Sequence, residues 1–400
     1  MISLIRFFKK FANSFCPVLL CAILLSSWGC LAIYNASLQF PQPEYYALKQ
    51  CTWLLIGVVL ALFLYRVNSE FIFKHIKLLY VLGIMSLLLV LFAGHTHNHM
   101  KGWFHTGWFS IQPSEFCKPL FCLFLCWYCS TQFSKEESDL KNYIKYLACA
   151  FPFILLVALQ PDFGTTLIYL VMTLAVYWLF NGRVKYLALS FLAMVPVMIT
   201  VLYKYPYVLG RLQGFMNPEA HSNGAGYHLL QLERSIARGG FWGQSFGKGL
   251  WSQGYLPLTH NDSIFASFCE AVGFVGGFAL ILVFIIALYA ANKKRERMQN
   301  SLYGNALFAM VFCLAFQAFI HISVNVQLLP PTGITLPFFS YGGSSLISSF
   351  LIIGFCKSVI ETDKRKRKLL KSQESGEVEP LEENFDSVKP ALIEKVEVAS

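Results

Sequence analysis

The sequence predicts an all-α, polytopic integral membrane protein with about ten transmembrane helices and one long extracytoplasmic loop. Of the 400 residues, 56% are hydrophobic and only 14% are charged, whereas a soluble domain carries about a quarter charged residues. Apolar runs of about 18 or more residues recur along the chain, each long enough to cross roughly 30 Å of hydrocarbon. The stretch 204–262, rich in Gly, Pro and polar residues, interrupts this pattern once.

The apolar runs place each span in order. The first run follows Arg6, Lys9 and Lys10 but has no small-residue cleavage site, so we expect a retained helix rather than a signal peptide. Residues 1–371 then form one transmembrane domain, and the acidic, apolar-poor stretch 372–400 forms a disordered cytoplasmic tail. The expected spans are 16–36, 51–66, 76–93, 115–133, 143–160, 163–180, 186–203, 263–290, 303–328 and 338–360.

The net charge of +10 does not indicate a nucleic-acid partner, because most basic residues lie in short alternate loops, where they set topology. These loops hold Arg66, Lys74 and Lys77; Lys135, Lys141 and Lys145; Arg183 and Lys185; and residues 293–297. Both termini are therefore expected in the cytoplasm. The unusual polar segments then share the outer face, where we expect one site assembled from 94–115, 160–166, 204–262 and 330–345.

The cysteines and clustered histidines do not predict a metal centre. The twelve cysteines lie almost entirely in apolar runs, which favours packing as small hydrophobic side chains over disulfides or thiolate ligands. His95, His97 and His99 alternate in an outer loop, where solvation is the more common state.

Three ionisable residues head outer-facing helix starts. Ser114 is an expected N-cap, with Glu115 favoured by the helix dipole. Lys118 lies one turn deeper, where a lysine is costly unless it pairs, as with Glu115, or binds a ligand such as phosphate. Asp162 follows Pro161 and either caps the next helix or contacts a ligand directly.

Two further segments carry structural signals. Residues 330–345 are dense in Pro and Gly at a span entrance; irregular backbone at membrane depth is tolerated where protein buries it or a wet cavity adjoins it. We expect a loop dipping into a substrate cavity, with an interfacial turn as the alternative. Residues 226–238 show helical spacing that fits a short helix lying on the membrane surface.

Asp262 stands where the long polar stretch meets an apolar run. Its structural role would be N-capping of the next span, and its chemical role would be general base. An exposed aspartate has a pKa near 3.9 and is a poor base. Partial burial at the membrane edge would raise that pKa toward the range useful near neutral pH.

Five motifs together resemble the SEDS family of shape, elongation, division and sporulation proteins over about residues 15–360. They are QPSEFCK, LQPDFGTT, GRLQGFMNPEAHSNGAGYHLLQ, LPLTHNDSIFA and LPPTGITLPFFSYGGSSLI. The resemblance implies a ten-span protein of the bacterial cell membrane that polymerises glycan strands from lipid II on the outer face. It also implies a class B penicillin-binding protein as partner.

The resemblance assigns roles residue by residue. The family motif HTDFIF corresponds to residues 260–265, which makes Asp262 the expected catalytic residue, although Asn261 and Ser263 depart from the motif. Gly102, beside Lys101, replaces an arginine that normally precedes the tryptophan matched by Trp103. The expected substrate-binding residues are Glu115, Lys118, Trp103, Arg211, Asp162, Ser340 and Tyr341.

The predicted reaction is an inverting glycosyl transfer serving cell elongation and shape. Lys118 and Arg211 are expected to neutralise the lipid pyrophosphate, with Mg²⁺ or Mn²⁺ as the candidate cofactor. GAGYHLLQ and GGFWGQSFGKGLWSQGYLP favour the elongation branch of the family, whereas LPPTGITLPF is closer to the division branch. The alternatives are a septal polymerase, a lipid II flippase, and a non-catalytic scaffold for the penicillin-binding partner.

Overall fold

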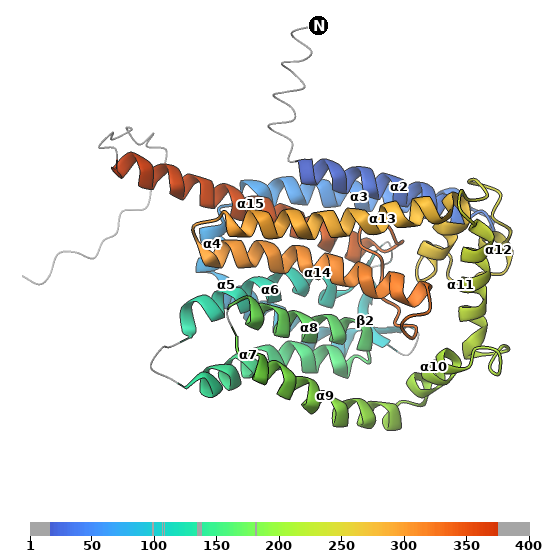
Figure 1. The fold of residues 1–400 in the computed structure, drawn as a ribbon, viewed down its shortest axis with the longest axis horizontal. Helices are drawn as coiled ribbons and strands as arrows, with labels where there is room; N and C mark the ends of the chain where they lie inside the picture. The colour runs from blue at the N-terminus through green and yellow to red at the C-terminus, as the bar shows by residue number, and fades with distance from the viewer. Residues whose placement is uncertain are drawn as a thin grey trace, which may run out of the picture.

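The computed structural model describes residues 17–97, 100–105, 107, 109–133, 138–180 and 182–374. Within these ranges, ten long helices follow one another in the predicted order and lie side by side as a bundle (Figure 1). They are α2 (Pro17–Ala36), α3 (Pro43–Arg66), α5 (Ile76–Ala93), α6 (Pro113–Gln132), α7 (Asp139–Leu159), α8 (Phe163–Leu179), α9 (Val184–Lys204), α13 (Ile264–Glu296), α14 (Ser301–Asn325) and α15 (Gly343–Glu374).

Seven of these helices, among the described residues, are long and apolar enough to cross a membrane: α2, α3, α5, α7, α13, α14 and α15. Helices α8 and α9 are shorter apolar helices, and α6 carries the buried Glu115 and Lys118 in its first turns. The chain is thus a mostly helical, multi-pass membrane protein, as the composition predicted.

Two helix boundaries differ clearly from the predicted ones. Helix α3 begins at Pro43, well before the expected start at 51, because Pro at the first helical position is pre-organised for a helix start. Helix α15 continues to Glu374, so the predicted tail begins inside a helix, and its remaining residues lie outside the described part of the chain.

The short elements near the helix ends were not predicted. Helix α4 (Ser69–Lys74) begins where Asn68 accepts a hydrogen bond from the Glu70 N–H. Strands β1 (His95–His97), β2 (Met100–His105) and β3 (Ser110–Ile111) form a small antiparallel sheet in the order β1-β2-β3. This sheet packs against α5 and α6.

The centre of the bundle is α14, which packs against α6, α8, α13 and α15. Large side chains such as Phe121, Tyr169 and Phe350 are fully buried around it. The described cysteines are free, and those of α6 (Cys117, Cys122, Cys126 and Cys129) are buried, so they pack as the small hydrophobic residues expected from the sequence.

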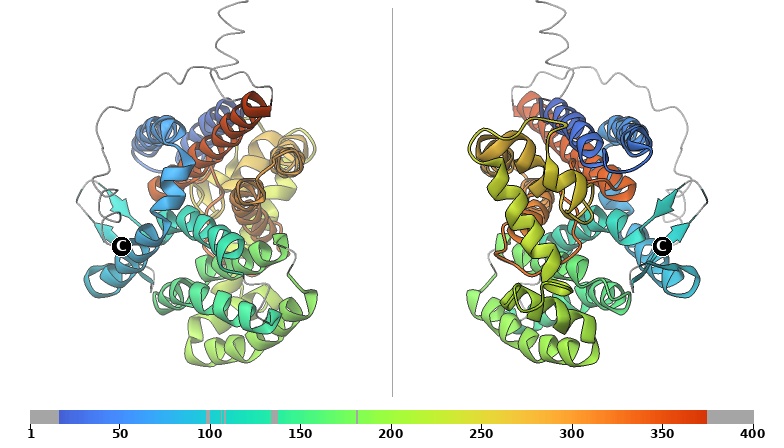
Figure 2. Two further views of the ribbon diagram at one scale, coloured as in Figure 1. Left: turned by 90° about the vertical axis from the view of Figure 1, so that its left-hand side faces the viewer. Right: turned by 90° about the vertical axis from the view of Figure 1, so that its right-hand side faces the viewer.

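The long segment between α9 and α13 is folded rather than irregular. It forms α10 (Pro206–Met216), α11 (Ala225–Gly239) and α12 (Leu250–Gly254), which lie across one end of the bundle (Figures 1 and 2, right view). The predicted short helix is therefore present as α11. Its buried Leu229 and Leu232 pack in one cluster with Ala266 of α13, so its apolar face covers protein rather than a membrane surface.

The long segment is attached to α13 at a break in that helix. Gly273 has φ 71°, and a side chain there would lie 2.4 Å from the main-chain nitrogen of Gly243. The main-chain groups that the break releases are paired with the loop: Gln244 N–H donates to Glu270 O and Phe274 N–H donates to Gly240 O, both at 2.9 Å. The close backbone approach explains the glycine.

Glu270 strengthens the same attachment. Its fully buried carboxylate accepts hydrogen bonds from the main-chain N–H groups of Trp251, at 3.0 Å, and Ser252, at 2.8 Å. Arg238 of α11 lies 3.7 Å from it. The start of α12 is therefore held on α13 by the buried carboxyl group of Glu270, a contact that was not predicted from the sequence.

Candidate functional site

One face of α14 carries three buried polar residues, Gln317, His321 and Asn325, spaced one turn apart. Each contacts a different segment of the site. Gln317 Oε1 accepts a hydrogen bond from Lys118 Nζ at 3.1 Å, and His321 Nδ1 donates to Ile334 O at 2.7 Å. Asn325 Nδ2 donates to Asp262 O at 2.9 Å. This polar face connects α6, the loop before α15, and the residues before α13.

The loop before α15 contacts the Asp262 segment directly. Ser340 Oγ donates to Asn261 O at 3.1 Å, and the Tyr341 N–H donates to His260 O at 2.9 Å. Gln50 of α3, which is fully buried, donates to Ser340 O at 3.0 Å. Ser340 and Tyr341 therefore lie beside Asp262, as the predicted gathering of outer loops requires.

The same loop runs inside the protein. Ile334, Leu336 and Phe339 are buried, and Gln317 Nε2 donates to Thr335 O at 3.0 Å. Phe338 has φ 65°, a left-handed conformation that is unusual for a bulky residue. The irregular backbone is thus enclosed by protein and satisfied by α14, which is one of the two conditions considered for this loop.

Asp262 is half-buried, and its side chain does not cap α13. The N-cap position belongs to Ser263, without a side-chain capping bond. From the residues that the structure describes, the Asp262 carboxylate accepts no hydrogen bond. Burial raises the pKa of Asp262 to about 6, and the charge of Arg211 opposes that rise. The carboxylate is therefore ionised at neutral pH while remaining a stronger base than an exposed aspartate.

Arg211 approaches Asp262 from α10. Its side chain is exposed; Nη1 donates to Pro331 O at 3.4 Å, and the guanidinium lies 5.6 Å from the Tyr207 ring centroid. Because its charge lowers the pKa of both Asp262 and His228, Arg211 is the basic group associated with the candidate base. A contact between Arg211 and the substrate pyrophosphate stays a prediction.

His228 of α11 is a site residue that sequence reasoning missed. Ser263 Oγ donates to Pro257 O at 2.7 Å, so it accepts from His228 Nε2, also at 2.7 Å. Burial, reinforced by the Arg211 charge, lowers the pKa of His228 to about 4. The imidazole is therefore neutral at pH 7 and fixes the residue that follows Asp262.

His260 is enclosed by aromatic rings. Ring centroids of Phe40, Tyr46 and Tyr341 lie 5.5, 4.9 and 5.5 Å from that of His260. Its Nδ1 is buried without a hydrogen-bond partner among the described residues, and burial lowers its pKa. This aromatic cluster therefore surrounds the residue two positions before Asp262.

Glu115 and Lys118 form a separate cluster deeper in the bundle. Lys118 Nζ lies 2.7 Å from Glu115 Oε1, and both side chains are under 10% exposed. Lys118 is bonded to Gln317 of α14, whereas the backbone of Asp262 is bonded to Asn325 of the same helix. Gln317 and Asn325 are two turns apart, which is roughly 12 Å along the helix axis. The pairing that the sequence offered as one alternative is present, and a ligand role for either residue stays a prediction.

The start of α6 differs from the predicted one. Pro113 occupies the first turn and Gln112 is the N-cap, so the expected capping by Ser114 is wrong. The buried hydroxyl of Ser114 has no partner among the described residues.

Asp162 does cap α8. Its carboxylate accepts a hydrogen bond from the Thr165 N–H at 3.0 Å, and it also accepts one from Gln112 Nε2 at 3.0 Å. Burial raises the pKa of Asp162, while the Thr165 hydrogen bond opposes the rise.

Trp103 lies on β2, half-buried, with its Nε1 unpaired among the described residues. Neighbouring Lys101 donates to Phe92 O at 3.1 Å. At Gly102, an added side chain would lie 3.1 Å from the Gln160 amide, which places this strand against the residues that precede Asp162. A substrate contact by Trp103 stays a prediction.

No group of three or more His, Cys, Asp or Glu that could hold a metal ion occurs among the described residues. His95 and His97 lie on β1, and His99 falls outside the described part of the chain. A divalent cation as cofactor stays a prediction.

The match to known proteins is extensive. The FtsW/RodA/SpoVE family model, described as cell cycle protein, matches residues 16–365. The chain belongs to this family. The match confirms the resemblance to the SEDS proteins that the five motifs predicted.

The curated relatives that the chain matches include different members of the FtsW/RodA/SpoVE family. The chain is 32% identical to "Probable peptidoglycan glycosyltransferase FtsW" of Idiomarina loihiensis, covering 87% of this chain and 86% of the relative. It is 30% identical to "Stage V sporulation protein E" of Bacillus subtilis, covering 84% and 94%. Several further curated relatives are also named FtsW, in contrast to the elongation branch that the motifs favoured.

The fold is shared with solved structures. A chain from "Structural coordination of polymerization and crosslinking by a peptidoglycan synthase complex" superposes with a TM-score of 0.72 at 24% identity, covering 85% of this chain and 97% of that chain. Rod shape determining protein RodA of Thermus thermophilus gives a TM-score of 0.64 at 22% identity, covering 86% and 95%. These likenesses establish the ten-helix fold of the family.

Proposed function

We propose that this protein is an inverting peptidoglycan glycosyltransferase that polymerises lipid II at the end of the bundle bearing Asp262. The observation that carries the proposal is the state of that carboxylate: it is half-buried, accepts no hydrogen bond from described residues, and has a pKa raised to about 6. A structural aspartate would be hydrogen-bonded. The relatives named as probable peptidoglycan glycosyltransferases support the reaction class.

In the proposed step, the 4-hydroxyl of the GlcNAc in one lipid II attacks C1 of the MurNAc at the lipid-linked end of the growing strand. The new bond joins that oxygen to C1, the bond from C1 to the pyrophosphate breaks, and undecaprenyl pyrophosphate leaves. Asp262 takes the hydroxyl proton. General-base catalysis is typically worth about 10²- to 10⁴-fold.

The leaving group needs positive charge. Arg211 is exposed, its charge acts on Asp262, and it forms no ion pair with a carboxylate among the described residues, so it is the first choice to bind the pyrophosphate. Lys118 is already paired with Glu115 and bonded to Gln317. We therefore propose that Lys118 and Glu115 support the site from within, and that Trp103, Asp162, Ser340 and Tyr341 border the substrate.

The partner and orientation follow from the same assignment. A chain of this fold was solved within a peptidoglycan synthase complex, which supports a class B penicillin-binding protein as partner. We place the Asp262 end on the outer face of a bacterial cell membrane, with both termini in the cytoplasm, because α13 ends at the other end with the basic residues Lys293, Lys294 and Arg295 in its last turn.

The elongation role and the septal role each have support, since the motif LPPTGITLPF is closer to the division branch. The motifs in the long segment favour the elongation member, RodA, and the names of curated relatives favour the division member, FtsW. Depletion of the protein from its host distinguishes them: loss of an elongation polymerase gives rounded cells, and loss of a division polymerase gives filaments.

The activity itself is tested with purified protein and fluorescent lipid II. We expect glycan strands resolved on a gel, with output increasing when the penicillin-binding partner is added. A flippase would instead move labelled lipid II across liposome leaflets without forming polymer. Transport without polymer, with or without the partner, would contradict the proposal.

A further inference from the structure

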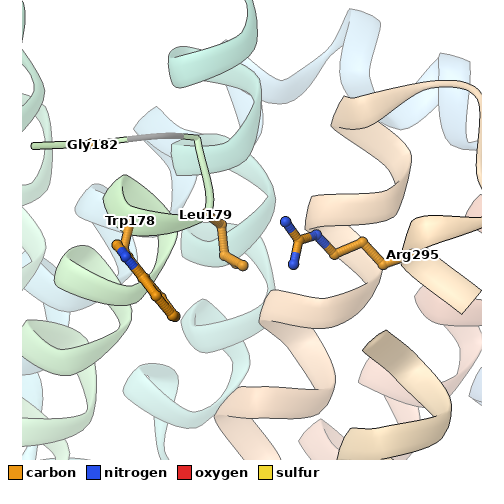
Figure 3. A pocket seen from close by; sticks show the side chains of 4 residues that line it. All are labelled: Trp178, Leu179, Gly182 and Arg295. Atoms are coloured by element: carbon orange, nitrogen blue, oxygen red, sulfur yellow. The ribbon is translucent and has the colours of Figure 1, made fainter. Parts of the chain in front are cut away.

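A cavity of about 500 Å³ lies at the other end of the bundle, lined by Trp178 and Leu179 at the end of α8, Gly182, and Arg295 near the end of α13 (Figure 3). Arg295 is 31 residues after Ile264 on the same helix, which is roughly 45 Å along its axis. The cavity is therefore separate from the Asp262 site.

The guanidinium of Arg295 is held in a fixed orientation toward this cavity. Its Nε donates to Asn305 Oδ1 at 2.7 Å, and Nη1 donates to Asn292 Oδ1 at 3.3 Å. Asn305 Nδ2 in turn donates to Leu179 O at 3.3 Å, which joins α14 to the cavity wall. Nη2 has no partner among the described residues, and Figure 3 shows the guanidinium pointing toward Leu179.

The charge around the cavity is positive and the acids nearby are engaged. Arg295 is the charged member of the four lining residues. Lys293 and Lys294 share the last turn of α13 with it, and Arg297 is the C-cap of that helix. Glu296 accepts from Asn292 Nδ2 at 2.9 Å, and Asp139 is paired with Arg183. A guanidinium with a spare donor in such surroundings matches a phosphate group.

The surroundings indicate that the phosphate belongs to a lipid. Trp178 is 61% exposed at the end of an apolar helix, and Val184, at the start of the next one, is 68% exposed. Tryptophan is enriched at membrane–water interfaces, where its ring lies at headgroup level. Basic pockets between helices at a membrane surface commonly hold anionic headgroups.

We propose that this cavity binds the headgroup phosphate of an anionic phospholipid, with Arg295 as the donor and Trp178 against the upper acyl chain. This site does not rest on the proposed glycosyl transfer. It would anchor the ends of α8 and α13 to lipid at the membrane face opposite Asp262.

Lipid retention by the purified full-length chain tests the proposal. In native mass spectrometry, the wild type should bind phosphatidylglycerol about tenfold more tightly than phosphatidylcholine, and Arg295→Gln should remove that preference. Lys293→Gln is the matched control, since it removes the same charge from the same helix end outside the cavity lining. Equal losses in the two variants, or no headgroup preference in the wild type, would overturn the site.

Two further arms separate the alternatives while leaving Arg295 unchanged. Brominated phosphatidylglycerol should quench fluorescence that is present in the wild type and missing in Trp178→Phe, whereas brominated phosphatidylcholine should not. Millimolar inorganic phosphate should leave phosphatidylglycerol binding unchanged. Displacement by inorganic phosphate would assign the cavity to a soluble anion and overturn the lipid assignment.

Discussion

Asn325 Nδ2 donates a hydrogen bond of 2.9 Å to the main-chain oxygen of Asp262, while its Oδ1 accepts from the Ala266 N–H at 3.1 Å. One buried side chain of α14 thus fixes the backbone of the proposed base and the first turn of α13. Since the carboxylate itself accepts no hydrogen bond from described residues, its position depends on this backbone restraint.

Replacing Asn325 by Leu should lower kcat for lipid II polymerisation by about tenfold or more, because each unsatisfied buried group costs about 1–3 kcal/mol. The KM for lipid II should change little, since Asn325 positions the base rather than the substrate. Asn142→Leu is the control: it removes a buried amide from α7 near the other end of the bundle. Equal loss of kcat in both variants, at matched thermal unfolding, would assign Asn325 a purely structural role.

The polymerisation rate should depend on pH through Asp262. Because its pKa is raised to about 6, the base is ionised at pH 7 and becomes protonated as the pH falls through 6. We expect kcat to decline about tenfold for each pH unit below that value. A rate that stays constant from pH 7.5 to 5 would show that no group with this pKa acts in the reaction.

Arg211→Gln should move that decline to higher pH, because the Arg211 charge lowers the pKa of Asp262 and its removal lets the pKa rise. The variant should also have a higher KM if Arg211 contacts the pyrophosphate. Arg234→Gln, which removes an exposed charge from α11, is the control. If both variants keep the wild-type pH profile, Arg211 does not act on Asp262.

His228 should hold Ser263, the residue after Asp262, in place rather than act as a base. Burial keeps its imidazole neutral, and its Nε2 donates a hydrogen bond to Ser263 Oγ. A glutamine amide can supply that donor, whereas leucine cannot. His228→Gln should therefore retain most activity, and His228→Leu should lose about tenfold, the effect of one buried hydrogen bond. Equal inactivity of the two variants would indicate that the imidazole itself exchanges a proton.

The parts of the fold set by local composition were predictable. Apolar run length gave the ten long helices, and Pro161-Asp162 gave the cap of α8. Local rules failed where two signals compete: Ser114 is a good capping residue, but Pro113 takes the first turn and moves the cap to Gln112. Helix α3 starts early because Pro43 is a helix-start signal inside a stretch too polar for a hydropathy window.

The site was predicted as a set of loops but not as a network. Gln50, His228 and Asn325 were missed because their partners are distant in sequence: Gln50 binds Ser340, and Asn325 binds Asp262. Nothing in the local pattern of a buried polar residue tells which loop it will meet. The spacing of Gln317, His321 and Asn325 on one helical face was a usable signal, since polar residues inside a span are costly unless they have partners.

The central claim is tested most directly by comparing the wild-type protein with Asp262→Asn in lipid II polymerisation at pH 7.5. The carboxylate accepts no hydrogen bond from described residues, so the amide should leave thermal unfolding unchanged. The account predicts a folded protein whose rate of glycan formation is lower by about 10²- to 10⁴-fold. Glycan output equal to that of the wild type would contradict the assignment of Asp262 as the catalytic base.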